Sequence, residues 1–198
     1  GTKRRSAKQI VEEIEAVGGH LNAYTSRDHT AYYAKVLKNS TSLAIDIVAD
    51  ILQNSIMDYS ELEREKDVIV QEINQSFDTP DDVVFDYFQE TAFPNQAIGY
   101  PVLGSAELVR SMTPELLKKY MANHYSGPKI VFAAAGNIDH DQLVELIQNA
   151  FIDLPNEKNS NKKEVHYIGG ESHHRRDIEQ AHVLIGMEGI SYLDENFH

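Results

Sequence analysis

The sequence predicts an α+β fold in which helices pack on one face of a mainly antiparallel sheet. Helix-like and strand-like segments are interspersed, without the regular alternation that a parallel sheet requires. Two neighbouring runs rich in aromatic and β-branched residues, 21–25 and 30–37, indicate a hairpin. The 198 residues, 41% of them hydrophobic, are enough for one core, so we expect one domain over residues 1–198.

The first helix is predicted from its capping box. Ser6 is followed three residues later by Gln9, and apolar residues then recur at helical spacing until a pair of glycines. The hairpin comes next, with the polar residues 26–28 as its turn. This arrangement places Tyr24 and Tyr32 on adjacent strands.

Further helices are expected at five places along the chain. They begin near Leu43, Ser60, Thr79, Thr113 and Asp139. Ser60 and Glu63 form a second capping box, which opens a long helix. Thr79 and Thr113 each precede a proline, a residue favoured in the first helical turn.

Three more strands are expected in the second half of the chain. Residues 129–135 form a continuous apolar run of strand length, and residues 164–167 and 182–187 are the other candidates. Residues 156–163 are rich in Asn, Lys and Ser and indicate a mobile surface loop.

Composition narrows the classes of partner. The chain has 18 Lys+Arg against 31 Asp+Glu, a net charge of -13 that repels nucleic acid and anionic membranes and attracts basic peptides. The same charge also serves simply to keep a domain in solution, and that alternative stays open. No apolar run is long enough to span a bilayer. The absence of cysteine fits a reducing compartment, so the bacterial cytoplasm is the expected location.

The long third helix carries the candidate chemistry. Glu65 and Glu72 are seven positions apart, which puts them with Val68 on one stripe of the helix. Glu72 is flanked by Val70 and Ile73, where an ionised carboxylate is costly unless it is paired or binds a cation. The alternative is an ordinary solvated helix face.

Several strings in the sequence resemble one family of enzymes. They are Gly1-Thr2-Lys3, residues 18–26, 32–34 and 63–73, and the shorter matches 80–82, 103–104 and 135–138. Together they are similar, in order and over nearly the whole chain, to the pitrilysin-type (inverzincin) zinc metallopeptidases. The likeness is greatest to the processing-peptidase branch found in mitochondria and bacteria. It implies a metallopeptidase N-terminal-domain fold and, as a second location, the mitochondrial matrix.

The resemblance also implies a zinc site. In the family an inverted H-x-x-E-H motif supplies two histidine ligands and a general base, and a later helix supplies a glutamate ligand. Glu72 matches that ligand, and Glu65 matches a glutamate that supports the site. None of the nine histidines lies in H-x-x-E-H. We therefore expect the motif before Gly1 and a second domain after His198, so that the chain is truncated at both ends, lacks zinc and is inactive alone.

The substrate strand is implied in the same way. Asn22, Ala23 and Tyr24 match an edge strand to which the family adds its substrate as a further strand. An edge strand without this role is the alternative. The pair His173 and His174 is expected in a surface loop, because adjacent strand residues point to opposite faces and cannot chelate one ion.

Two functions remain open at this stage. The first is part of a zinc-dependent endopeptidase that hydrolyses targeting sequences or other unfolded, basic peptides. The alternative is a non-catalytic homologous subunit that binds peptides or scaffolds other chains. Either function is compatible with a homodimer or a heterodimer, and neither calls for a nucleic acid or a membrane.

Overall fold

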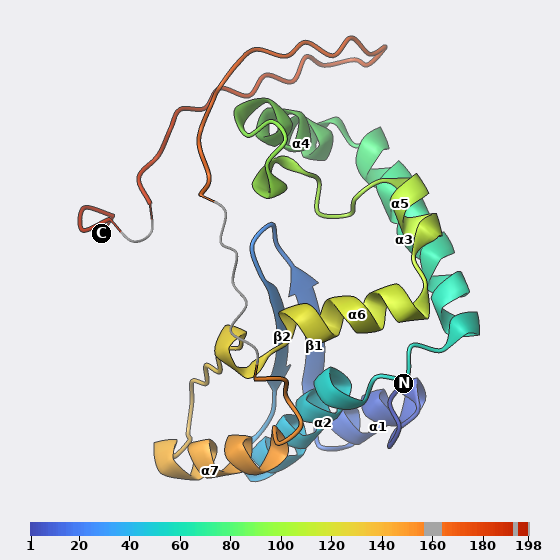
Figure 1. Cartoon of the computed structure of the whole chain (residues 1–198), viewed down its shortest axis with the longest axis vertical. Helices are drawn as coiled ribbons and strands as arrows, with labels where there is room; N and C mark the ends of the chain where they lie inside the picture. Colours follow the sequence, from blue (N-terminus) through green and yellow to red (C-terminus); the bar gives the residue numbers. More distant parts are fainter. Residues whose placement is uncertain (157–163, 192–193, 198) are drawn as a thin grey trace. The chain divides into compact units, whose positions relative to one another are not determined.

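The computed structural model describes residues 1–156, 164–191 and 194–197 (Figure 1). The chain groups into two compact units. The first comprises Gly1–Thr25, His29–Glu65 and Met112–Asn161, and the second Ser26–Asp28, Lys66–Ser111 and Lys162–His198. The boundary falls within one helix, so that the chain passes from one unit to the other without a linker there. The assignment of residues 1–198 to one partial peptidase domain stays a prediction.

The first unit contains most of the regular structure. Its elements in chain order are α1 (Ala7–Ala16), β1 (His20–Thr25), β2 (Thr30–Lys35), the 3-10 turn η1 (Lys38–Ser40), α2 (Thr41–Asn54), α6 (Pro114–His124), η3 (Gly127–Lys129) and α7 (His140–Ala150). The α+β class predicted from the sequence is confirmed: helices are interspersed with an antiparallel sheet, which in the described residues has two strands.

Local sequence signals fix the helix starts. Both hydrogen bonds of the capping box at Ser6 and Gln9 are present, and Gly18 follows the helix with a φ of 67° that glycine adopts without strain. Thr113 and Asp139 accept the N-capping hydrogen bonds of α6 and α7. These predicted helices are confirmed.

One face of the hairpin packs on the helices. β1 and β2 are antiparallel, with Leu21 opposite Ala34 and Ala23 opposite Tyr32. Leu21 and Ala34 contact the buried cluster of Ile14, Ala44 and Ile47, which α1 and α2 contribute. Helices therefore cover one sheet face, as predicted, and the alternate side chains of the strands form the other face.

The second unit is built around the end of a long helix. Its elements are the C-terminal part of α3 (Tyr59–Asp78), then α4 (Pro80–Ala92), η2 (Ala97–Gly99) and α5 (Ala106–Ser111). The predicted cap of α3 is wrong by two residues. Asp58 caps the helix and accepts from the backbone N–H of Glu61, while Ser60 donates to Asp58. Asp58 rather than Ser60 caps the helix because a carboxylate accepts a hydrogen bond more strongly than a hydroxyl does.

The three strands predicted in the second half do not form. Residues 129–135, 164–167 and 182–187 carry no strand in the structure. An apolar run becomes a strand only when a partner strand satisfies its backbone groups, and the described residues supply none. Val131 is consequently 89% exposed. Of the loop predicted at 156–163, residues 157–163 lie outside the described residues.

Contacts of the second unit hold its C-terminal segment against α4. Ile168 donates its N–H to the carbonyl of Ala92 at 2.9 Å, and Gln96 exchanges two hydrogen bonds with the backbone of His166.

Among the described residues, no helix is long and apolar enough to cross a membrane.

Candidate functional site

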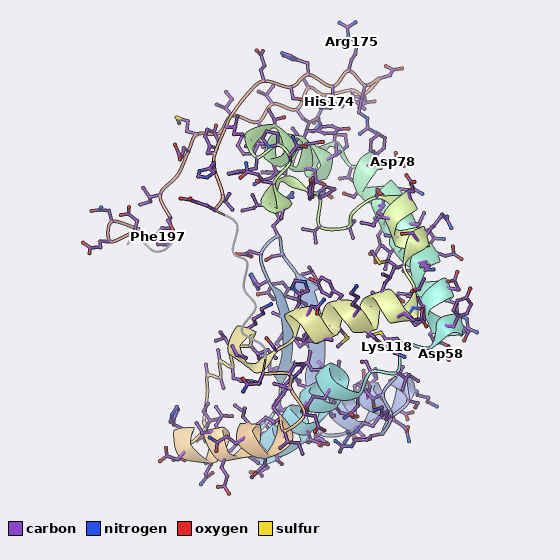
Figure 2. The ribbon with its side chains drawn as sticks, viewed as in Figure 1. Asp58, Asp78, Lys118, His174, Arg175 and Phe197 are labelled. Atoms are coloured by element: carbon purple, nitrogen blue, oxygen red, sulfur yellow. The ribbon has the colours of Figure 1, made fainter. Side chains whose placement is uncertain are left out.

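The two candidate acids lie on α3, whose ends are marked by Asp58 and Asp78 in Figure 2. Glu65 and Glu72 are both exposed, whereas Lys66 and Val70 are buried. Val70 and Ile73, which flank Glu72 in the sequence, are buried and half-buried, and the role predicted for Glu72 stays a prediction. Ile73 beside Glu72 is apolar and half-buried, whereas Gln71 on its other side is polar and exposed like Glu72 itself.

Neighbouring acids on α3 are paired, and these two are not. Glu61 accepts from Arg64 at 2.8 Å, and Asp67 lies 3.6 Å from Arg110. Within the described part of the chain, no hydrogen bond or salt bridge reaches the carboxylate of Glu65 or Glu72. Both carboxylates are thus available to a cation or to another chain.

The donor set does not make a metal site by itself. Among the residues the structure describes, no group of three or more His, Cys, Asp or Glu side chains is placed to hold a metal ion. A zinc ion in a protein takes three or four ligands. Glu72 is one donor of the right chemistry, and the described residues do not complete the set.

The predicted substrate strand is β1, one of the two strands of the described hairpin. Asn22, Ala23 and Tyr24 are all exposed. The backbone N–H of Ala23 donates to the side-chain Oδ1 of Asn22 at 2.8 Å. The structure thus describes an exposed strand in which a side chain satisfies the N–H of Ala23.

Aromatic rings form a row on the exposed sheet face. The rings of His20 and Tyr33 are 6.4 Å apart, those of Tyr33 and Tyr24 6.2 Å, and those of Tyr24 and His29 5.6 Å. The Tyr24 hydroxyl lies 3.3 Å from the His29 ring nitrogen. The hairpin thus brings His20 and His29, nine positions apart in the chain, to the two ends of one row of rings.

Tyr32 has a different environment from that row. Its side chain lies on the opposite strand face from Tyr33, with its ring 6.5 Å from that of Tyr125. Burial first, and then hydrogen bonding with Tyr125, raise the pKa of the Tyr32 phenol well above its usual range. Tyr32 therefore stays neutral and serves packing.

A buried ionic network near the start of the chain was not predicted from the sequence. The Asp50 side chain is fully buried and accepts from the Thr2 hydroxyl at 2.7 Å, from Arg5 at 3.1 Å and from Asn54 at 3.0 Å. Arg5 also donates to Asp46 at 2.6 Å. The available signal in the sequence was the pair Asp46 and Asp50, four positions apart in the largely apolar helix α2.

The histidine pair in the second unit is exposed, as expected of a surface loop. His173 lies 2.7 Å from Glu171, and the ring of His174 stacks on Tyr87 at 3.5 Å. Figure 2 labels His174 beside Arg175 in this extended segment. The two imidazoles have separate partners and do not converge on one point.

Comparison with known proteins decides the family. The model described as Insulinase (Peptidase family M16) matches residues 1–106, more than half of the chain. The chain belongs to peptidase family M16. A second model, described as Peptidase M16 inactive domain, matches residues 111–197. The pitrilysin-type resemblance drawn from the sequence is confirmed, and with it membership of a family of zinc peptidases.

Similar proteins come from bacteria and from mitochondria. An uncharacterized zinc protease of Rickettsia felis is 40% identical over 194 residues, covering 98% of this chain and 47% of the relative. The β subunit of the mitochondrial-processing peptidase of Neurospora crassa is 38% identical over 204 residues, covering 100% of this chain and 43% of the relative. Subunit 1 of the bovine mitochondrial cytochrome b-c1 complex is 38% identical over 194 residues, covering 96% of this chain and 40% of the relative. The M16 chain thus spans less than half the length of these relatives.

Solved structures share the fold. A protease from Helicobacter pylori superposes with a TM-score of 0.78 at 20% identity, covering 85% of this chain and 41% of that one. The M16 inactive domain from Pseudomonas fluorescens gives a TM-score of 0.76 at 16% identity, covering 83% of this chain and 40% of that one. At these identities the likeness concerns the fold alone.

Proposed function

We propose that this chain is part of a zinc-dependent endopeptidase that hydrolyses targeting sequences or other unfolded peptides. The observation that carries the proposal is the pair of exposed carboxylates on α3, Glu65 and Glu72. Neither is engaged by a cation of the described chain, although Glu61 and Asp67 on the same helix are. This helix lies inside the region matched by the M16 peptidase model.

In this proposal each acid has its own role. Glu72 supplies one carboxylate ligand to zinc, and an H-x-x-E-H motif of the whole protein supplies the histidine ligands. Glu65, two helical turns before Glu72 on the same stripe, orients a ligand or a bound water. The 198-residue chain, with one ligand, has no peptidase activity of its own.

Peptide recognition falls to β1. Asn22, Ala23 and Tyr24 present an exposed strand that can pair with an extended substrate through backbone hydrogen bonds. The net charge of -13 favours basic peptides. Unfolded basic segments are therefore the proposed substrates, the whole protein works as a homodimer or heterodimer, and the bacterial cytoplasm is its proposed location, with the mitochondrial matrix as the alternative.

A second candidate function is a non-catalytic subunit. Two observations favour it: the 38% identity to a cytochrome b-c1 complex subunit, and the match of residues 111–197 to a model described as inactive. Such a subunit would keep the fold and bind peptides or other chains. Nothing in that role requires unpaired carboxylates at Glu65 and Glu72, which is why we place it second.

One experiment separates the two functions. The whole protein is purified, its zinc content is measured by mass spectrometry, and cleavage of an unfolded basic peptide is followed with and without a chelator. The proposal expects about one zinc per chain and cleavage that the chelator abolishes and added zinc restores. A protein without zinc and without cleavage would be the non-catalytic subunit.

A further inference from the structure

Arg27 lies in the turn of the hairpin, and its guanidinium is held at three points. Nη2 donates to the Asp86 carboxylate of α4 at 2.5 Å, and Nη1 donates to the carbonyl oxygens of Ile98 and Tyr100. Only 20% of the Arg27 side chain and 34% of the Asp86 side chain are exposed. The planar fork of an arginine reaches a carboxylate and carbonyl oxygens together, which the single ammonium of a lysine does not.

The acceptors of Arg27 are held in place by the turn η2. Gly99 in this turn is buried, and a side chain there would collide with the carbonyl oxygen of Phe93 at the end of α4. The N–H groups of Gly99 and Tyr100 bond back to the same short segment, at 3.0 Å and 3.2 Å. The turn is therefore packed closely on α4, and Arg27 meets acceptors whose positions are already fixed.

The contacts of Arg27 divide the hairpin between the two units. Strands β1 and β2 belong to the first unit, whereas residues 26–28 belong to the second. The chain also passes from the first unit to the second inside α3, after Glu65. A continuous helix is stiff by its own hydrogen bonds, but a turn is not. Arg27 supplies the missing restraint, because it ties the turn to α4 and η2.

We infer that Arg27 is a positioning residue that determines which peptide bond is cleaved. This inference rests on the proposed function, in which β1 binds the peptide and Glu72 of the second unit binds zinc. By holding the end of β1 to the second unit, Arg27 limits how far a bound peptide can shift relative to the zinc ligand. A displacement of about 1 Å can cost about 100-fold in rate, so a little slack in this turn is enough to bring neighbouring bonds into use.

The strength of the contact sets the size of the effect. A hydrogen bond to a charged group changes an equilibrium by at least about 10-fold. The partial exposure of Arg27 and Asp86 keeps the value near that lower limit. Loss of Arg27 should therefore make the released turn about 10-fold more populated. Release frees η2 to open, which exposes the N–H groups of Gly99 and Tyr100 to exchange.

The test uses three variants of the whole protein and a control. Arg27→Gln removes both the charge and the fork, Arg27→Lys keeps the charge without the fork, and Asp86→Asn removes the ion-pair partner. Arg110→Gln is the matched control, because Arg110 forms an exposed pair with Asp67 at 3.6 Å in the same unit.

Three quantities are measured for each protein. Hydrogen exchange is followed by mass spectrometry on peptides that contain Gly99 and Tyr100. Zinc content is determined, and the products of one unfolded basic peptide are identified by mass, which shows every bond that is cut. Lower stability alone would reduce the amount of product without changing which bond is cut. The pattern of products therefore separates positioning from a merely structural role.

We expect Arg27→Gln to speed exchange at Gly99 and Tyr100 about 10-fold and to raise the share of product cut at neighbouring bonds about 10-fold, at unchanged zinc content. Asp86→Asn should act in the same direction with a smaller size, because the two carbonyl acceptors remain. Arg27→Lys should fall between the unaltered protein and Arg27→Gln. Arg110→Gln should change none of the three quantities.

Two results would overturn the inference, and both differ from a failure of the proposed function. If Arg27→Gln leaves exchange at Gly99 and Tyr100 unchanged, Arg27 does not hold the turn. If exchange rises but the peptide is still cut at the same bond alone, the turn does not determine the cleaved bond. An unaltered protein without zinc and without cleavage would contradict the proposed function itself, and the positioning role with it, even where the exchange result holds.

Discussion

The buried network around Asp50 gives the most quantitative prediction. Asp50→Ala removes a fully buried carboxylate that accepts from Thr2, Arg5 and Asn54. Each buried donor left without a partner costs about 1–3 kcal/mol. Arg5 is spared that cost, because it keeps Asp46 at 2.6 Å and Glu13 at 2.9 Å.

The expected loss is therefore smaller than the about 3–5 kcal/mol for a buried charge left alone. The buried Thr2 hydroxyl keeps only the Arg5 carbonyl at 3.4 Å, and the half-buried Asn54 amide can reach water, so we expect the free energy of unfolding to fall by about 1–3 kcal/mol. Urea unfolding followed by circular dichroism measures the change as a lower midpoint at an unchanged slope. Asp153→Ala, at an exposed aspartate of the same unit, is the control.

A loss below about 0.5 kcal/mol, the size of an ordinary surface substitution, would refute the reasoning. It would mean that water or another acceptor replaces the carboxylate without cost. A double-mutant cycle with Thr2→Val sharpens the test, because two contacting residues should show a coupling of at least about 0.5 kcal/mol. Additive losses would show that the 2.7 Å hydrogen bond contributes nothing.

Two further predictions concern the same unit. Ser6→Ala removes the capping box of α1 and should lower the free energy of unfolding by about 1 kcal/mol in the same urea experiment, whereas an unchanged midpoint would contradict the cap. Burial opposes ionisation of Asp46, but hydrogen bonds from Arg4 and Arg5 outweigh it, and its pKa lies below the usual range. A carboxyl whose folded pKa is depressed stabilises the protein above its unfolded pKa, about 3.9, and loses that contribution as the pH falls through the folded pKa. Asp46→Asn should therefore flatten the fall in stability below about pH 4, and an identical pH profile would contradict the assignment.

Helix starts were predictable because their signals are local. Ser6 with Gln9, and Thr113 before Pro114, specify a cap within four residues of chain, and both form as expected. The six-residue helix α5 was missed, although Ser105 accepts from the N–H of Leu108 at its start. A helix this short leaves too few apolar positions for a periodicity to show.

Strands were predictable only where the partner is adjacent in sequence. β1 and β2 need a turn of a few residues, whereas the run at 129–135 needs a partner that its own residues cannot specify. The network at Asp50 was missed for the same reason, since it joins residues 48 positions apart. The placement of Glu65 and Glu72 on one helix followed from spacing alone, but their exposure did not.

The zinc role of Glu72 is the central claim, and one measurement on the whole protein tests it most directly. Zinc content and peptide turnover are compared for the unaltered protein and for Glu72→Gln, Glu65→Gln and Glu61→Gln. Loss of a residue that only supports a metal site costs about 10–100-fold in affinity or activity, which sets the lower bound for Glu72. Glu65→Gln should lower zinc content and turnover less than Glu72→Gln does. Glu61→Gln should leave zinc content and turnover almost unchanged, because Glu61 is already paired with Arg64. Equal zinc content and equal turnover in the Glu72 and Glu61 variants would contradict the assignment.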